Sequence, residues 1–179
     1  MTFVSLARHG QTEYNAVERF QGHLPVPLDA TGREQAHELA RVAARREWAA
    51  LLCSPLHRAR ETAEIVGAAI GHHPVADARF AETDCGDWTD RPFAEVRAAE
   101  PERFNAYITA DPGFAFPGGE SFAQQQLRVL EGIDAAKAGP LPVLIVTHRG
   151  SIRLALAAIH GDDAYRSADI PNASLVDLP

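Results

Sequence analysis

Short runs of apolar and β-branched residues alternate with amphipathic helical segments along most of this 179-residue chain. The clearest predicted strand is the run VLIVT at 143–147, and the segment that follows it repeats its apolar residues at helical spacing. Further strands are predicted at 2–6, 49–53, 74–76 and 174–178, and the other main helices at about 32–46, at 55–70 and after 121. This alternation predicts an α/β fold, a three-layer α/β/α sandwich whose mainly parallel sheet has helices on both faces.

Capping residues mark the starts of three of these helices. Thr31 and Glu34 have the spacing of a capping box for the helix at 32–46. Ser54 and Pro55 would supply the N-cap and the first-turn proline of the next helix. The motif SFAQ at 121–124 predicts a further capped start.

The composition is that of an ordinary globular domain, with 46% hydrophobic and 23% charged residues. The length fits one domain over 1–179 with a small insertion at about 84–120. We expect no membrane span and no secretory signal, because neither a long apolar run nor a basic, apolar N-terminus is present. The net charge of −7 argues against a nucleic-acid surface, which needs a basic excess. Cys53 and Cys85 fit reduced thiols in the cytoplasm better than a disulfide framework.

Two tripeptides with reactive side chains follow predicted strands, RHG at 8–10 and HRG at 148–150. Arg58 lies one turn into the helix that follows the second strand. The carboxyl ends of parallel strands meet at one edge of the sheet, where ligands of open α/β sheets bind. Imidazoles and guanidiniums gathered there repel one another unless an anion lies between them, and phosphate suits the forked donors of arginine.

His9 can do more than bind that anion. A neutral imidazole nitrogen beside an arginine-bound phosphate can attack phosphorus and form a phosphohistidine. Departure of the alkoxide then requires an acid, and Glu82, which leads into the insertion, is the candidate. Arg8, Arg58 and a protonated His148 would neutralise the charge that a metal ion otherwise offsets, so we expect no metal and no other cofactor.

Ordered blocks over essentially the whole chain resemble the histidine phosphatase superfamily, which includes the phosphoglycerate mutases. The blocks are LARHGQTEYN at 6–15, RFQG at 19–22, SPLHRARETA at 54–63, the stretch 82–88, PGGES at 117–121, VTHRG at 146–150, and Asn172 with Ser174.

The resemblance implies that His9 is the phosphorylated nucleophile and that Glu82 is the proton donor. The residues that it assigns to phosphate or substrate binding are Arg8, Asn15, Gln21, Gly22, Arg58, His148 and Arg149. The acid phosphatase branch has an acidic residue directly after the second histidine, where this chain has Arg149. The branch of mutases and small-molecule phosphatases is therefore favoured.

The chain departs from the family pattern at two places. Relatives commonly carry Gly at the position of Arg149, and Trp-Glu-Gly where this chain reads Trp88-Thr89-Asp90. These differences bear on the contacts with substrate more than on phosphoryl transfer.

The predicted insertion is short and aromatic. Eight of the 13 aromatic residues lie between 80 and 122, around short helices predicted at 93–99 and 101–108. They form either the insertion's own small core or a partly apolar wall over the site. Only 35 residues separate Glu82 from Gly118, and they contain three arginines and no lysine. Mutase relatives have a longer, more basic insertion, so this one favours a phosphatase.

The predicted function is a metal-independent phosphatase that hydrolyses small-molecule phosphate monoesters through a phosphohistidine. Two alternatives stay open, a cofactor-dependent phosphoglycerate mutase and a non-catalytic phospholigand-binding module. A zinc protein is disfavoured, because His72 and His73 have no third ligand at a zinc-like spacing. Sugar phosphates, nucleotides, phosphoserine, α-ribazole phosphate and phosphoglycerate all fit as substrates. No nucleic-acid or membrane partner is expected, and the oligomeric state, a homodimer included, is open.

Overall fold

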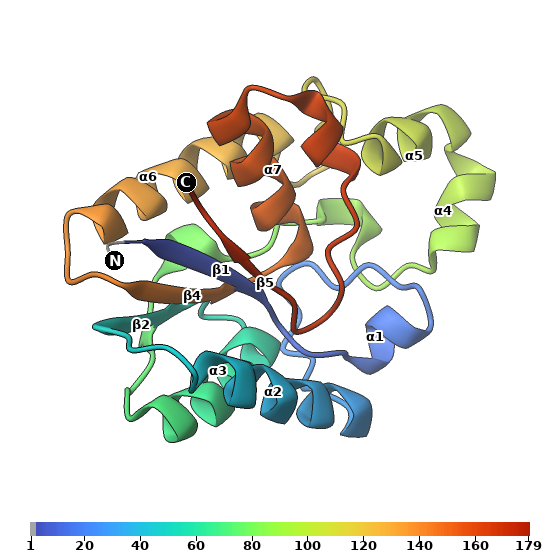
Figure 1. Ribbon diagram of the computed structural model, residues 1–179. Coiled ribbons are helices and arrows are strands. Elements are labelled where there is room, and N and C mark those ends of the chain that lie inside the picture. Colours follow the sequence, from blue (N-terminus) through green and yellow to red (C-terminus); the bar gives the residue numbers. More distant parts are fainter. Residues whose placement is uncertain (1–2) are drawn as a thin grey trace.

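The computed structural model describes residues 3–179 and contains a five-stranded sheet in the order β3-β2-β4-β1-β5 (Figure 1). The strands are β1 (Val4–Arg8), β2 (Ala50–Cys53), β3 (Val75–Ala76), β4 (Val143–Thr147) and β5 (Leu175–Asp177). β1 and β2 both pair in parallel with β4, and β2 also pairs in parallel with β3. The last strand, β5, runs antiparallel to β1. The predicted mainly parallel sheet is confirmed.

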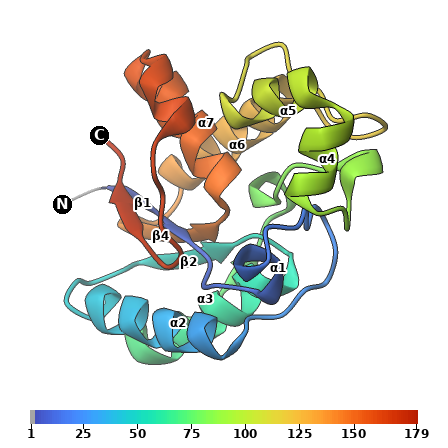
Figure 2. The same cartoon turned by 90° about the vertical axis from the view of Figure 1, so that its right-hand side faces the viewer.

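Helices cover both faces of this sheet. α2 (Ala30–Ala43) and α3 (His57–Ile70) lie on one face, and α6 (Phe122–Lys137) and α7 (Arg149–His160) on the other (Figure 2). The predicted three-layer α/β/α sandwich is therefore confirmed. Among the described residues, no helix has the length and apolar character needed to cross a membrane.

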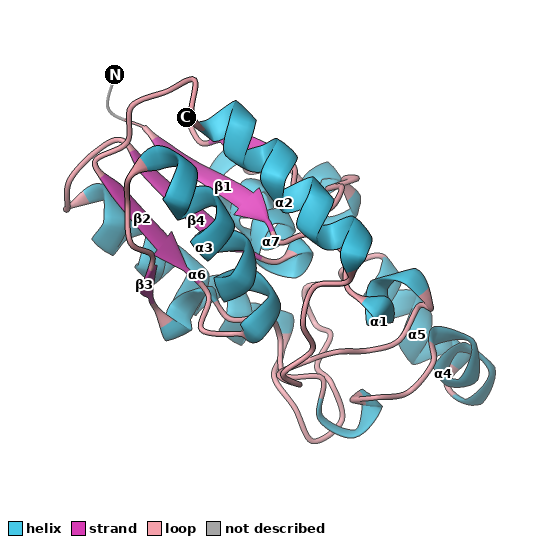
Figure 3. Ribbon diagram, turned by 90° about the horizontal axis from the view of Figure 1, so that it is seen from below, coloured by secondary structure: helices cyan, strands magenta, loops and turns pink. Residues whose placement is uncertain are grey.

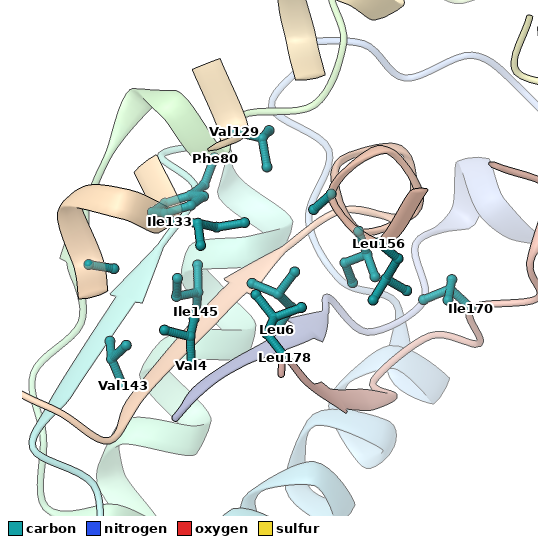
Figure 4. Close-up of a cluster of buried hydrophobic side chains, with 13 residues drawn as sticks. Val4, Leu6, Phe80, Val129, Ile133, Val143, Ile145, Leu156, Ile170 and Leu178 are labelled. Atoms are coloured by element: carbon teal, nitrogen blue, oxygen red, sulfur yellow. The ribbon is translucent and has the colours of Figure 1, made fainter. Parts of the chain in front are cut away.

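The two central strands, β1 and β4, are buried along their whole length because both of their faces are covered. Leu6 and Ile145 point into the core beneath α6 and α7, together with Val129 and Ile133 (Figure 4). Leu144, next along β4, belongs instead to the core beneath α2 and α3. Successive strand side chains point to opposite faces, so one continuous apolar run supplies both cores.

Two of the predicted helix starts are wrong. Asp29, not Thr31, caps α2, since its carboxylate accepts a hydrogen bond from the Gly32 amide and the helix begins at Ala30. Aspartate is as good an N-cap as threonine, so the earlier start is equally stable. α3 begins at His57, with Leu56 as its N-cap and no side-chain cap. The Ser54 hydroxyl accepts from the Leu56 amide at 3.2 Å and contacts a histidine across the sheet edge. The capping box at 121–124 is confirmed at the start of α6.

The insertion lies beyond the carboxyl ends of the strands. Figure 3 shows the arrowheads of β1 and β2 pointing towards the end of the molecule that carries α1 (Glu13–Ala16), α4 (Phe93–Ala99) and α5 (Pro101–Ile108). Short 3₁₀ helices lie at Ala78–Phe80, Gly86–Trp88 and Asp163–Ser167. The aromatic residues of the insertion form a buried cluster with residues outside it; the cluster contains Phe20, Trp88, Phe104, Phe114, Phe116 and Phe122. Phe93, Tyr107 and Phe116 also line a cleft beyond the strand ends, so the insertion combines both predicted arrangements, a small core and a partly apolar wall.

Candidate active site

A cleft of about 380 Å³ opens where the ends of β1 and β4 meet the insertion. It brings together most residues that the sequence predicted for the site; those lining it are Arg8, His9, Asn15, Gln21, Gly22, Arg58, Glu82 and Arg149. His148 lies next to the cleft, with its ring centroid 5.1 Å from that of His9. The predicted set is thus gathered at one edge of the sheet.

His9, the candidate nucleophile, has a defined tautomer. Its Nδ1 lies 2.6 Å from the Gly10 carbonyl oxygen, which can only accept, so Nδ1 carries the proton and Nε2 has a free lone pair. The chain after His9 packs closely on α2, where a Cβ on Gly10 would lie 2.3 Å from the Gly32 carbonyl oxygen. Glycine at position 10 permits this approach, which places the loop that holds His9.

The surroundings of His9 keep its imidazole neutral. The ring is 3% exposed, and burial together with the positive charges of Arg58 and Arg8 lowers the pKa of His9 well below its ordinary value. A neutral ring is what nucleophilic attack requires.

His148 directly follows β4 and is the N-cap residue of α7. Its Nε2 lies 2.7 Å from the Ser54 hydroxyl, while its buried Nδ1 has no partner among the described residues. Burial and the charge of Arg58 lower the pKa of His148 well below its ordinary value. The protonated His148 expected from the sequence therefore needs the negative charge of a bound phosphate. In the protonated ring both nitrogens are donors, so Nε2 donates to the Ser54 hydroxyl and Nδ1 is left to donate to that phosphate.

Arg8 and Arg58 are buried cations held in place by backbone oxygens. Arg8 donates to the Ile170 carbonyl at 2.7 Å, and Arg58 donates to the Gly22 carbonyl at 3.0 Å. Burial lowers the pKa of each guanidinium to about 10, so both stay charged at neutral pH. The Nε atoms of both are buried without a partner among residues 3–179. Buried unpaired donors of this kind indicate a site that an anion completes.

Asn15 and Gln21 present amide donors to the cleft. The Asn15 side-chain oxygen accepts a hydrogen bond from the Thr12 amide at 3.1 Å. The single proton of the Thr12 hydroxyl lies within reach of both side-chain oxygens, at 3.0 Å from Asn15 and 2.9 Å from Gln21. Because both oxygens are engaged, the NH₂ groups are the ends left for a ligand. The buried Thr12, which the sequence did not single out, thus orients both.

Glu82, the candidate acid, is held through one oxygen. Its Oε1 accepts hydrogen bonds from the Thr83 amide and from Gln125 Nε2, both at 3.0 Å. Gln125 is buried in α6 and also donates to Ser151 at 3.1 Å. Within the described residues Oε2 has no hydrogen-bond partner and is the oxygen left to carry a proton.

Other supporting residues were missed from the sequence. Arg128 of α6 donates to the carbonyls of Ala81 and Glu82 and pairs with Glu120 at 2.6 Å. The exposed His23 contacts the Glu82 carbonyl oxygen at 2.7 Å. Glu120 lies in the PGGES block, and this block was the only sequence signal for the contacts that hold the segment around Glu82.

Cys85 lines the cleft, and burial raises its pKa far above the ordinary value, so the thiol stays protonated and inert. Among the described residues, no group of three or more His, Cys, Asp or Glu side chains is arranged to hold a metal ion.

Comparisons with known proteins agree with this geometry. The family model for the histidine phosphatase superfamily (branch 1) matches residues 4–178. A glucosyl-3-phosphoglycerate phosphatase of Mycolicibacterium vanbaalenii is 39% identical over 97% of this chain and 82% of its own length. A probable phosphoglycerate mutase of Yersinia enterocolitica is 32% identical over 98% of this chain and 83% of its own.

Solved structures also resemble this chain over its whole length. A mycobacterial glucosyl-3-phosphoglycerate phosphatase in complex with VO3 superposes with a TM-score of 0.92 at 31% identity, over 100% of this chain and 93% of that one. Bacillus stearothermophilus YhfR superposes with a TM-score of 0.92 at 31% identity, over 100% of this chain and 91% of that one. The chain therefore belongs to branch 1 of the histidine phosphatase superfamily.

Proposed function

We propose that this protein is a phosphatase that hydrolyses small-molecule phosphate monoesters through a phosphohistidine on His9, without a metal ion. The observation that carries the proposal is the unprotonated Nε2 of His9 in a pocket with two buried, charged guanidiniums. The phosphatase and mutase names among its relatives support the same chemistry.

The first step transfers the phosphoryl group to the enzyme. The Nε2 lone pair of His9 attacks phosphorus as the bond to the leaving oxygen breaks, and Glu82 gives its proton to that oxygen. Arg8, Arg58 and the Nδ1 donor of His148 stabilise the charge on the other phosphate oxygens. The products are the free alcohol, a phosphohistidine and an ionised Glu82.

The second step regenerates the enzyme. Ionised Glu82 takes a proton from a water molecule whose oxygen attacks phosphorus, and the N–P electron pair returns to His9 Nε2. Inorganic phosphate leaves, and Glu82 is again protonated.

Hydrolysis of p-nitrophenyl phosphate tests the nucleophile. We expect His9→Ala to abolish turnover and to abolish acid-labile phosphate labelling of the quenched enzyme. His73→Ala, which removes an exposed histidine in a loop, is the matched control and should keep both turnover and phosphate labelling. Label on any residue other than His9 would refute the assignment.

Substrates with good and poor leaving groups test the acid. Glu82→Gln keeps an oxygen for the bonds from Thr83 and Gln125 but has no proton to give. It should slow alkyl phosphates by roughly 10²–10⁴-fold and p-nitrophenyl phosphate much less. Asp84→Asn, an exposed neighbour outside the cleft lining, is the control. Equal losses on both substrates would exclude the role.

The mutase alternative is decided by the fate of the phosphoenzyme. A mutase must keep water from the phosphohistidine and return the phosphate to an acceptor hydroxyl. The proposed phosphatase should pass the phosphate mainly to water when 3-phosphoglycerate is present at millimolar concentration. Predominant transfer to phosphoglycerate would make the protein a mutase.

Two further expectations belong to this proposal. The range matched by the family model supports a chain that forms one domain, with the insertion as part of it. Cys53 and Cys85 are both free and buried, which supports a reducing compartment such as the cytoplasm.

A further inference from the structure

The arginines of this chain divide into two groups by their partners. Ten of the 16 form an ion pair with a carboxylate within the described residues. Within residues 3–179, the six that do not are Arg8, Arg45, Arg58, Arg97, Arg149 and Arg153. Five of these six line the cleft, and the sixth, Arg45, is exposed after α2. Arg8 and Arg58 are assigned to the transferred phosphate, which leaves Arg97, Arg149 and Arg153. The resemblance assigns Arg149 to phosphate or substrate binding without saying which group it binds.

Two of the three lie together on one helix. Arg149 and Arg153 are the first and fifth residues of α7, so they lie one turn apart on the same face. Both are half-buried. Arg153 is anchored by the Ala168 carbonyl at 2.6 Å, and Arg149 has only a long contact of 3.5 Å to the Tyr107 hydroxyl.

This arrangement is unfavourable for the protein alone. Like charges four residues apart on a helix repel, and a cation in the first turn opposes the helix dipole. The positive charge of Arg149 is also felt by its neighbours, since burial first and then Arg149 lower the pKa of both Arg8 and Arg153. An anion between the two guanidiniums would relieve each of these effects.

We infer that Arg149 and Arg153 form a second anion site in the cleft, which binds a carboxylate or second phosphate carried by the leaving group of the substrate. The inference rests on the proposed phosphatase function and names its substrate class. Arg149 precedes Gly150, which lies against Glu82, so this site adjoins the acid that protonates the leaving oxygen. Tyr107, Phe116 and Phe122 line the same cleft and would cover the apolar part of such a leaving group.

Pairs of substrates that differ by one anionic group test the site. 3-Phosphoglycerate and glycerol 3-phosphate share a three-carbon skeleton and differ in a carboxylate, whereas fructose 1,6-bisphosphate and fructose 6-phosphate differ in a second phosphate. Release of inorganic phosphate gives kcat/KM for each. A charge-assisted, forked hydrogen bond predicts a preference of roughly 10- to 100-fold for the anionic member of at least one pair. The substrate pair that shows this preference identifies the bound group as a carboxylate or as a phosphate.

Variants then locate the preference. Arg149→Gln should reduce the ratio of kcat/KM for the substrate with the extra anionic group to kcat/KM for its partner by roughly 10-fold or more. Arg149→Lys keeps the charge but not the forked donors, so its ratio should lie between those of the wild type and Arg149→Gln. Arg45→Gln removes an unpaired arginine outside the cleft and should leave the ratio and the activity unchanged.

The outcomes separate this inference from the proposed function. A wild-type enzyme that hydrolyses p-nitrophenyl phosphate but shows no preference within either pair refutes the second site alone. A preference that Arg149→Gln leaves unchanged also refutes it. Absence of hydrolysis of every monoester, with the fold intact, instead refutes the proposed phosphatase.

Discussion

Gly150→Ala is a small substitution that should damage the acid without damaging the fold. A Cβ at position 150 would lie 2.7 Å from Glu82 Oε1 and 3.3 Å from Gln125 Nε2. An ordinary contact begins near 3.4 Å, so the carboxylate oxygen must retreat by about 0.7 Å. That movement changes the hydrogen bonds that fix Oε1 and turns the proton on Oε2 away from the leaving oxygen.

The two energetic effects of this substitution on stability oppose each other. Alanine is favoured over glycine in a helix by about 1 kcal/mol. Weakening one hydrogen bond to Glu82 costs about 0.5–1.5 kcal/mol. The free energy of unfolding should therefore change by about 1 kcal/mol or less. Misplacement of a catalytic group by about 1 Å, in contrast, can lower the rate by roughly 10²-fold.

The assay compares kcat/KM for an alkyl phosphate with that for p-nitrophenyl phosphate. We expect Gly150→Ala to slow the alkyl ester by roughly 10²-fold and the aryl ester by less than about tenfold, because nitrophenolate barely needs a proton. Gly139→Ala is the control, since a Cβ there meets its nearest atom at 3.4 Å in an exposed turn. Equal losses on both esters, or a variant that no longer folds, would refute the reasoning.

Three further results are expected. The pKa values of His9 and His148 are lowered in the folded protein, so just below pH 6.5 these two histidines bind protons only in the unfolded chain. The free energy of unfolding should therefore fall as the pH drops from 7 to 5. The slope is at most about 1.4 kcal/mol per pH unit for each histidine, and urea titrations of His148→Gln should show a shallower fall. Arg149→Gln should raise the free energy of unfolding by about 0.5–1 kcal/mol in calorimetry without an anionic ligand; a lower melting temperature would contradict the repulsion argued for α7. Hydrolysis of p-nitrophenyl phosphate should persist in excess EDTA, and its loss would show that a metal ion is needed.

The parts of the site that depend on strand ends were predictable from the sequence. His9 and His148 follow short runs that predict strands, and the alternation with helices predicts that these strands are parallel. Their meeting at one edge of the sheet follows from that arrangement. The short helix Pro101–Ile108 was also predictable, since a proline in the first turn and the apolar spacing indicate the same element.

The support of the acid was not predictable, because it depends on contacts distant in the sequence. Gln125 reaches Glu82 across 43 positions, and no local pattern distinguishes it from the other glutamines of α6. The Ser54 hydroxyl accepts from the nearby Leu56 amide, but its contact with His148 joins residues 94 positions apart.

Most of the buried polar atoms without a hydrogen-bond partner within residues 3–179 lie at the cleft. Among the described residues, four buried side-chain atoms lack a hydrogen-bond partner, and three of them belong to Arg8, Arg58 and His148. Each such atom costs about 1–3 kcal/mol. The repelling pair Arg149 and Arg153 adds a further cost in the same cleft. A substrate with two anionic groups would satisfy all these groups at once, whereas inorganic phosphate satisfies only the first set. The stabilisation of the fold by a bis-anionic ligand should therefore exceed that by phosphate, because more of the unfavourable interactions built into the free protein are relieved.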